Sequence, residues 1–133
     1  MNTTDAASGK GWAFWFLRVA AVYNLAWGAF MMAAPNMWWD MLGLVRPNYM
    51  FLWSGTGLFV ALFGIGYWIA AADPKRHIGL LVIGLASKVL AFLGTMNGCF
   101  LEKNVPGVFA VTAVVNDLIW IPGMAAIVFR GRK

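Results

Sequence analysis

Long runs of apolar residues, separated by short polar segments, dominate the pattern along this chain. Four runs stand out, at residues 12–34, 49–72, 78–101 and 107–129. Each can form a helix that crosses a bilayer, because about 20 residues rising about 1.5 Å each span a hydrocarbon core of about 30 Å. The pattern therefore predicts an all-α integral membrane bundle of four transmembrane helices, forming one domain over residues 1–133.

The segments between the runs are short and differ in character. Pro35 and Asn36 end the first run. Residues 37–48 then mix tryptophan with scattered charge, which is typical of a stretch lying at the lipid headgroups. Residues 73–77 and 102–106 are read as tight polar turns. The spans are thus expected to be neighbouring antiparallel helices.

Composition strengthens the membrane interpretation. The chain has 133 residues, of which 62% are hydrophobic and 11% charged, whereas soluble domains carry about 25% charged residues. A soluble core of this size could not bury so much apolar surface. The net charge of +5 does not indicate nucleic acid as a partner, because the basic residues flank the apolar runs and form no basic stripe.

The basic residues also predict an orientation. With four spans, both termini lie on the same side, and the opposite side holds only Arg46 and Lys103 outside the spans. The terminal side collects Lys10, Lys75, Arg76, Arg130, Arg132 and Lys133. The positive-inside rule therefore predicts that both termini are cytoplasmic.

Lys88 and Asp117 are the sharpest chemical feature, because a charge at the centre of a span costs about 2.5–3.5 kcal/mol on insertion scales. The third and fourth runs form a predicted hairpin that turns near Lys103. Lys88 lies about 15 residues before this turn and Asp117 about 14 after it, so both lie at about the same depth. We expect an ion pair between the two helices, since two separately buried charges would cost far more.

The surroundings of this pair define a predicted buried polar group. Helical spacing places small residues on the faces that carry the two charges: Gly84, Ala91 and Thr95 with Lys88, and Ala110 and Ala113 with Asp117. The group comprises Lys88, Asp117, Asn116 and Thr95. It is either a structural pin that fixes the register of the helices or a proton or substrate site; alternatively, one of the two charges faces water.

A second polar group lies in the first run and consists of Arg18, Tyr23 and Asn24. Arg18 is close enough to the interface to extend its charged end toward the headgroups. It is read either as an anchor or as a contact to a ligand or partner. Asn24 and Asn116 are expected to form hydrogen bonds between helices.

Glycine and proline positions give further expectations about packing. Gly57, Ala61 and Gly64 recur at helical spacing and predict a face that packs against another helix. Pro122 is expected to kink the fourth span and to leave the carbonyl of Leu118 free.

No residue pattern indicates a catalytic or metal site. The single cysteine, Cys99, and the single histidine, His77, cannot form a tetrahedral zinc site by themselves. No cofactor is predicted. The spacing of the aromatic residues leaves open whether a pigment, quinone or lipid binds between the helices.

Five short motifs resemble small bacterial four-helix membrane proteins that are distantly similar to the DoxX-like family. They are Tyr23-Asn24-Leu25-Ala26-Trp27-Gly28, Gly64-Ile65-Gly66-Tyr67, Asp73-Pro74-Lys75-Arg76-His77, Gly84-Leu85-Ala86-Ser87-Lys88 and Asn116-Asp117-Leu118-Ile119-Trp120. The resemblance implies a bacterial inner membrane protein. It also implies an accessory role in a respiratory or redox assembly, although no ligand set for a redox cofactor is visible.

Three functions remain open from the sequence. The first is a non-enzymatic membrane component, either an accessory subunit or a homo-oligomer, whose partners are the lipid bilayer and other membrane subunits or further copies of the chain. The alternative is a transporter or channel for a proton, an ion or a small solute, with Lys88, Asp117, Asn116 and Thr95 along its path. The third is an intramembrane enzyme that uses Lys88 and Asp117 as an acid–base pair.

Overall fold

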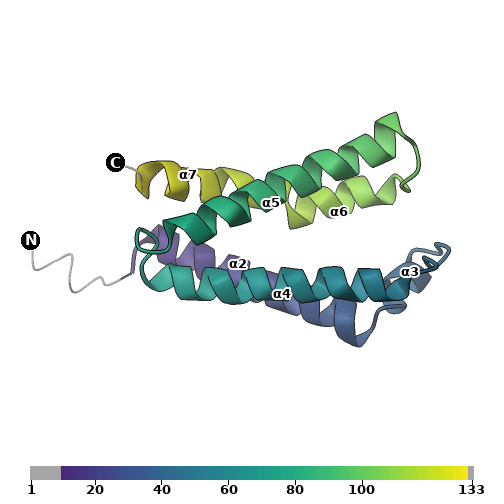
Figure 1. The fold of residues 1–133 in the computed structure, drawn as a ribbon, viewed down its shortest axis with the longest axis horizontal. Coiled ribbons are helices and arrows are strands. Elements are labelled where there is room, and N and C mark those ends of the chain that lie inside the picture. Colours follow the sequence, from purple (N-terminus) through teal and green to yellow (C-terminus); the bar gives the residue numbers. More distant parts are fainter. Residues whose placement is uncertain (1–9, 132–133) are drawn as a thin grey trace, which may run out of the picture. The chain divides into compact units, whose positions relative to one another are not determined.

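The structure is a computed structural model that describes residues 10–131, and all of its regular secondary structure over that range is helical. Figure 1 shows the elements, which are α2 (Trp12–Ala33), α3 (Met37–Met41), α4 (Met50–Ala72), α5 (Ile78–Met96), the π-helix η1 (Asn97–Leu101), α6 (Val108–Asn116), the 3₁₀-helix η2 (Leu118–Trp120) and α7 (Ile121–Gly131). The predicted all-α fold class is confirmed.

Four helical stretches are long and apolar enough to cross a membrane, namely Trp12–Ala33, Met50–Ala72, Ile78–Leu101 and Val108–Arg130. Large apolar side chains are exposed along all of them; Phe59 is 64% and Leu90 is 68% exposed. Such a surface promotes aggregation in water but matches a bilayer. These features indicate a small multi-pass membrane protein.

The contacts divide the chain into two compact units, Met1–Ala72 and Asp73–Lys133. The first contains the α2–α4 helical hairpin, and the second contains α5 through α7. That the whole chain forms one domain stays a prediction.

The first unit is built on a seam of small residues between α2 and α4, which lie side by side (Figure 1). A methyl group added at Gly28 would overlap the backbone carbonyl of Gly57, and one added at Gly64 would lie 2.9 Å from the carbonyl oxygen of Ala21. The two backbones therefore approach as closely as their atoms permit. The packing face predicted from Gly57, Ala61 and Gly64 is confirmed, and it contacts α2.

The connection from α2 to α4 is held by an ion pair and by clustered tryptophans. Arg46 donates from Nε and Nη2 to the two carboxylate oxygens of Asp40, at 2.8 and 2.7 Å. The hydrogen bonds from Arg46 lower the pKa of the Asp40 carboxyl group, and the same contact raises the pKa of Arg46. The rings of Trp27 and Trp38 pack edge to face with centroids 5.0 Å apart, as do Trp39 and Trp53 at 5.3 Å.

The second unit begins with α5, which passes directly into η1. The turn that follows folds back, so that the backbone N–H groups of Asn104 and Val105 both donate to the carbonyl of Gly98. A methyl group at Gly98 would meet Val105 at 2.6 Å, whereas one at Gly94 would meet nothing within 4 Å. The lack of a side chain at Gly98 therefore allows the turn to fold back against η1, and it does not allow two long helices to approach each other.

The fourth span is interrupted, which corrects the expectation of a helix kinked at Pro122. α6 ends at Asn116, η2 follows, and α7 starts at Ile121, so that Pro122 is the second residue of a new helix. Proline is well tolerated there, because the first N–H groups of a helix have no partner within it. The carbonyl of Leu118 was expected to be free, but it accepts the N–H of Ile121.

Candidate functional site

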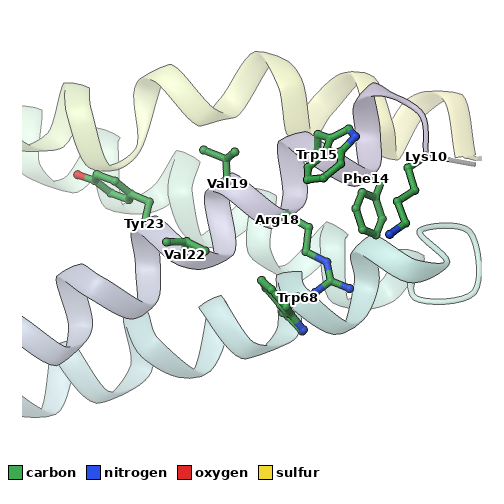
Figure 2. A pocket seen from close by; sticks show the side chains of 8 residues that line it. All are labelled: Lys10, Phe14, Trp15, Arg18, Val19, Val22, Tyr23 and Trp68. Atoms are coloured by element: carbon green, nitrogen blue, oxygen red, sulfur yellow. The ribbon is translucent and has the colours of Figure 1, made fainter. Parts of the chain in front are cut away.

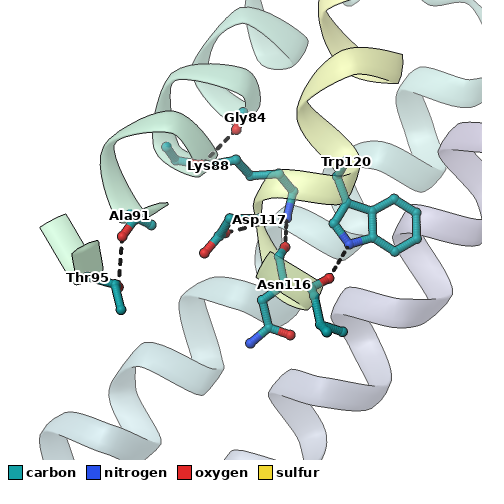
Figure 3. Close-up of polar contacts among 9 residues, drawn as sticks. Gly84, Lys88, Ala91, Thr95, Asn116, Asp117 and Trp120 are labelled. Carbon is teal, nitrogen blue, oxygen red and sulfur yellow. Dashed lines mark hydrogen bonds and ion pairs between the residues drawn. The ribbon is translucent and has the colours of Figure 1, made fainter. Parts of the chain in front are cut away.

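The second unit brings Lys88 of α5 against the break between α6 and α7 (Figure 3). Lys88 Nζ lies 3.9 Å from Asp117 Oδ1 and donates a hydrogen bond of 2.8 Å to the backbone carbonyl of Asn116. The side chains of Lys88 and Asp117 are 6% and 17% exposed. The two charges are therefore paired within one helical hairpin, as their similar distances from the turn predict.

The break is what makes the carbonyl of Asn116 available to Lys88. In a continuous α-helix this carbonyl would accept the N–H of the residue four positions later, Trp120. Here the N–H of Trp120 donates to the carbonyl of Asp117 instead, at 3.1 Å. The ammonium group of Lys88 replaces the missing donor, and thus satisfies a backbone group that lipid could not.

Trp120 completes the site from the other side of the break. Its indole Nε1 donates to the carbonyl of Val115 at 3.0 Å, and the side chain is 9% exposed. Two consecutive carbonyls at the end of α6 therefore accept side-chain donors, one from Lys88 and one from Trp120. The sequence reasoning missed this role of Trp120.

Thr95 has no part in these contacts. Its hydroxyl donates to the carbonyl of Ala91, four residues earlier in the same helix, at 2.8 Å. This is the usual local bond of a threonine within a helix. Of the expected polar group, Lys88 therefore contacts Asp117 and the carbonyl of Asn116, and Trp120 joins the site at the carbonyl of Val115.

The polar group expected in the first span separates into two parts. Arg18 and Tyr23 line a groove of about 620 Å³ on the first unit (Figure 2). Asn24 is buried at 5% exposure and does not line this groove. The hydrogen bond expected of the Asn24 side chain is not found within residues 10–131.

Arg18 is fixed in the groove by aromatic rings. Its guanidinium carbon lies 3.6 Å from the ring centroid of Trp68 on α4 and 4.9 Å from that of Phe14 on its own helix. A cation over an aromatic face is attracted by the ring quadrupole. Trp68 therefore holds Arg18 against α4, and Lys10 reaches the same ring of Phe14, at 4.7 Å.

The chemistry of the two places differs. Lys88 and Asp117 satisfy each other's charge inside a helical hairpin, whereas Arg18 and Lys10 present charge in an open groove. Within residues 10–131 there is no cluster of three or more His, Cys, Asp or Glu side chains that could hold a metal ion.

Comparison of the chain with family models, with curated proteins and with solved structures finds no match. The four long apolar helices define the class of the chain as a small, all-α, multi-pass membrane protein. The resemblance to the DoxX-like family stays a prediction from the five short motifs.

Proposed function

We propose that this chain is a non-enzymatic membrane component, either an accessory subunit of a larger assembly or a self-associating unit of the bacterial inner membrane, with both termini in the cytoplasm. The observation that carries the proposal is the internal satisfaction of its buried charges. Lys88 contacts Asp117 and the Asn116 carbonyl, so the site stabilises the broken fourth span.

The surface of α5 supports an assembly role. Leu81, Gly84 and Lys88 are the residues of this helix that are buried, and Ile83 and Leu93 on its other faces are 60% and 57% exposed. A helix that packs within its own unit along so narrow a stripe leaves most of its surface to lipid, to the first unit or to a neighbouring subunit.

The mass of the particle tests this proposal. The full chain, tagged and extracted from its native membrane in mild detergent, is expected to run as a homo-oligomer or together with other membrane subunits. A particle that contains one copy and nothing else would overturn the proposal.

The double variant Lys88→Met with Asp117→Leu is expected to preserve both the assembly and the growth phenotype, because the pair has a structural role.

A transporter or channel is the second candidate, and the discontinuity of the fourth span favours it. Broken helices at mid-depth, with exposed backbone carbonyls, form ion and substrate sites in secondary transporters. Proteoliposomes that contain the wild-type chain would then show flux of protons or cations that varies with pH, and the same double variant would abolish it. If no flux is observed in either direction, the transporter is excluded and the structural role of the Lys88–Asp117 site remains.

A further inference from the structure

Within residues 10–72, two positive charges of the first unit have no counter-charge. Residues 10–72 contain three basic residues, Lys10, Arg18 and Arg46, and a single acidic residue, Asp40. Asp40 is engaged by Arg46 in the ion pair beyond the other end of α2. Lys10 and Arg18 therefore need an anion from elsewhere, since an uncompensated charge near lipid is costly.

These two cations converge on one place. Both lie against the ring of Phe14, at 4.7 Å for Lys10 Nζ and 4.9 Å for the guanidinium carbon of Arg18. Figure 2 shows their charged ends pointing into the same space beside Trp68. Like charges held by one ring repel each other, and an anion that contacts both replaces this repulsion with two attractions.

Arg18 also has hydrogen-bonding capacity that the described residues do not use. Its Nε atom is enclosed and has no hydrogen-bond partner within residues 10–131. A guanidinium carries five N–H donors in a planar fork that matches phosphate oxygens. The stacking of Arg18 on Trp68 presets the orientation of this fork, so a phosphate could bind without further ordering of the side chain.

From the cations the groove continues along an apolar wall. Trp15, Val19 and Val22 line it and are 58%, 57% and 56% exposed. Val19 and Val22 lie on α2 between Arg18 and Tyr23, whereas Trp15 lies at the cationic end beside Phe14 (Figure 2). Such a wall suits an acyl chain that descends from a headgroup at the level of Lys10 and Arg18.

We propose that this groove is a binding site for an anionic glycerophospholipid, with its phosphate between Lys10 and Arg18 and an acyl chain along Val19 and Val22. A lipid with net negative charge compensates the two cations, whereas a zwitterionic lipid brings no net charge. Basic pockets beside transmembrane helices recognise anionic headgroups in this way.

Lipid binding to the full chain tests the proposal. The protein, purified in an uncharged detergent, is titrated with phosphatidylglycerol, with phosphatidylcholine and with inorganic phosphate, and bound molecules are counted by native mass spectrometry. We expect tighter binding of phosphatidylglycerol than of phosphatidylcholine, by about fivefold for each cation and so about 25-fold in all. Equal affinity for the two lipids would overturn the proposal.

Charge variants locate the site. Lys10 lies outside every helix, so Lys10→Gln is expected to reduce the preference for phosphatidylglycerol over phosphatidylcholine about fivefold without affecting the fold. Adding Arg18→Gln is expected to remove the rest of this preference. Lys75→Gln is the matched control, because it removes one exposed positive charge from the polar turn after α4. If Lys75→Gln weakens binding as much as Lys10→Gln does, the lipid is held by the general surface charge and not by the groove.

Two further variants separate the lipid from other occupants. Val22→Trp fills the apolar wall and leaves both cations, so it is expected to weaken binding of phosphatidylglycerol but not of inorganic phosphate. Phosphate that binds wild type as tightly as the lipid does would mean a free-anion site. Asp5→Asn is expected to change nothing, whereas binding that appears only in this variant would identify Asp5 as the occupant. Either of these last results would overturn the lipid assignment.

Discussion

Lys88 combines two roles that are usually separate, since one ammonium group pairs with a carboxylate and also caps a backbone carbonyl. The first role depends on the side chain of Asp117, and the second on the backbone of Asn116. The loss of the lysine therefore leaves two buried groups without a partner, while the loss of the aspartate leaves one.

This asymmetry predicts the order of stability among wild type, Lys88→Met and the double variant. Lys88→Met is expected to cost about 3–5 kcal/mol, because it leaves Asp117 unpaired in a nonpolar environment. Adding Asp117→Leu removes that unpaired charge and is expected to recover most of the loss. The double variant stays below wild type by about 1–3 kcal/mol, the cost of the uncapped Asn116 carbonyl. Reversible unfolding in mixed micelles measures all three free energies.

The opposite order would contradict the pairing. If both single variants, Lys88→Met and Asp117→Leu, are more stable than the double variant, the two side chains do not depend on each other. Ser87→Ala is a suitable control, because its hydroxyl bonds only to the Gly84 carbonyl one turn earlier in α5. It is expected to change the free energy of unfolding by less than about 1 kcal/mol.

Asp40 and Arg46 predict a pH dependence at the polar connection between α2 and α4. The folded-state pKa of Asp40 is lowered by Arg46, so the pair stabilises the fold above the unfolded pKa. That contribution is lost as the pH falls through the lowered folded pKa. Wild type and Arg46→Gln should therefore differ slightly in melting temperature at neutral pH and converge in acid, below the ordinary pKa of 3.8. A difference that grows in acid would contradict this sign.

At the scale of the elements, the two units are stabilised differently. The α2–α4 pair depends on the close approach of two backbones, whereas the part from α5 to α7 depends on contacts at the break between α6 and α7. The seam between α2 and α4 has backbone against backbone at Gly28 and Gly57. The α6–α7 junction exchanges regular helical hydrogen bonds for contacts from Lys88 and Trp120. The α2–α4 pair is therefore sensitive to added side-chain volume at its glycines, and the α6–α7 junction is sensitive to loss of the side-chain donors Lys88 and Trp120.

Two glycines of α4 give a matched test of the seam. A methyl group at Gly57 would lie 2.6 Å from Cβ of Met31, whereas one at Gly55 would meet nothing within 4 Å. We expect Gly57→Ala to destabilise the chain by about 1–3 kcal/mol through overpacking. Gly55→Ala should be neutral or slightly stabilising, since alanine is the better helix former. Equal effects of the two variants on the unfolding free energy would contradict the seam.

The sequence was sufficient to predict the four spans and the meeting of Lys88 with Asp117, but not the break in the fourth span. Hydropathy locates helices because lipid requires long apolar segments, and a rise of about 1.5 Å per residue sets the depths of Lys88 and Asp117. The break depends on which N–H reaches which carbonyl, and a backbone carbonyl has no signature in the sequence. One usable signal was present: Pro122 favours the first turn of a helix, which places a helix start close to it.

At the scale of the molecule, the four helices within residues 10–131 that are long enough to cross a membrane predict an even number of crossings over that range. The balance of basic residues adds the direction. The orientation is therefore a property of the whole chain, because it depends on the basic residues in all of the segments between the spans.

Cysteine labelling in intact cells tests this topology. In a Cys99→Ser background, Val45→Cys is expected to react with a membrane-impermeant maleimide added outside, because Val45 is 92% exposed in the connection between α2 and α4. Lys75→Cys, beyond α4, is expected to react only after the cells are lysed. Labelling of both positions from outside would contradict a membrane crossing by α4, and the reverse pattern would invert the orientation.

The glycine seam also determines which changes in chain length the first unit tolerates. One residue inserted into α2 between Ala21 and Gly28 rotates everything beyond it by about 100°. The small residues on the two sides of the insertion then no longer share one face, and a bulky side chain is turned toward α4 at one end of the seam. The same insertion among residues 42–48 leaves both helices intact and only lengthens a connection. Length variation in this unit should therefore be confined to that connection, with α2 and α4 kept in fixed register.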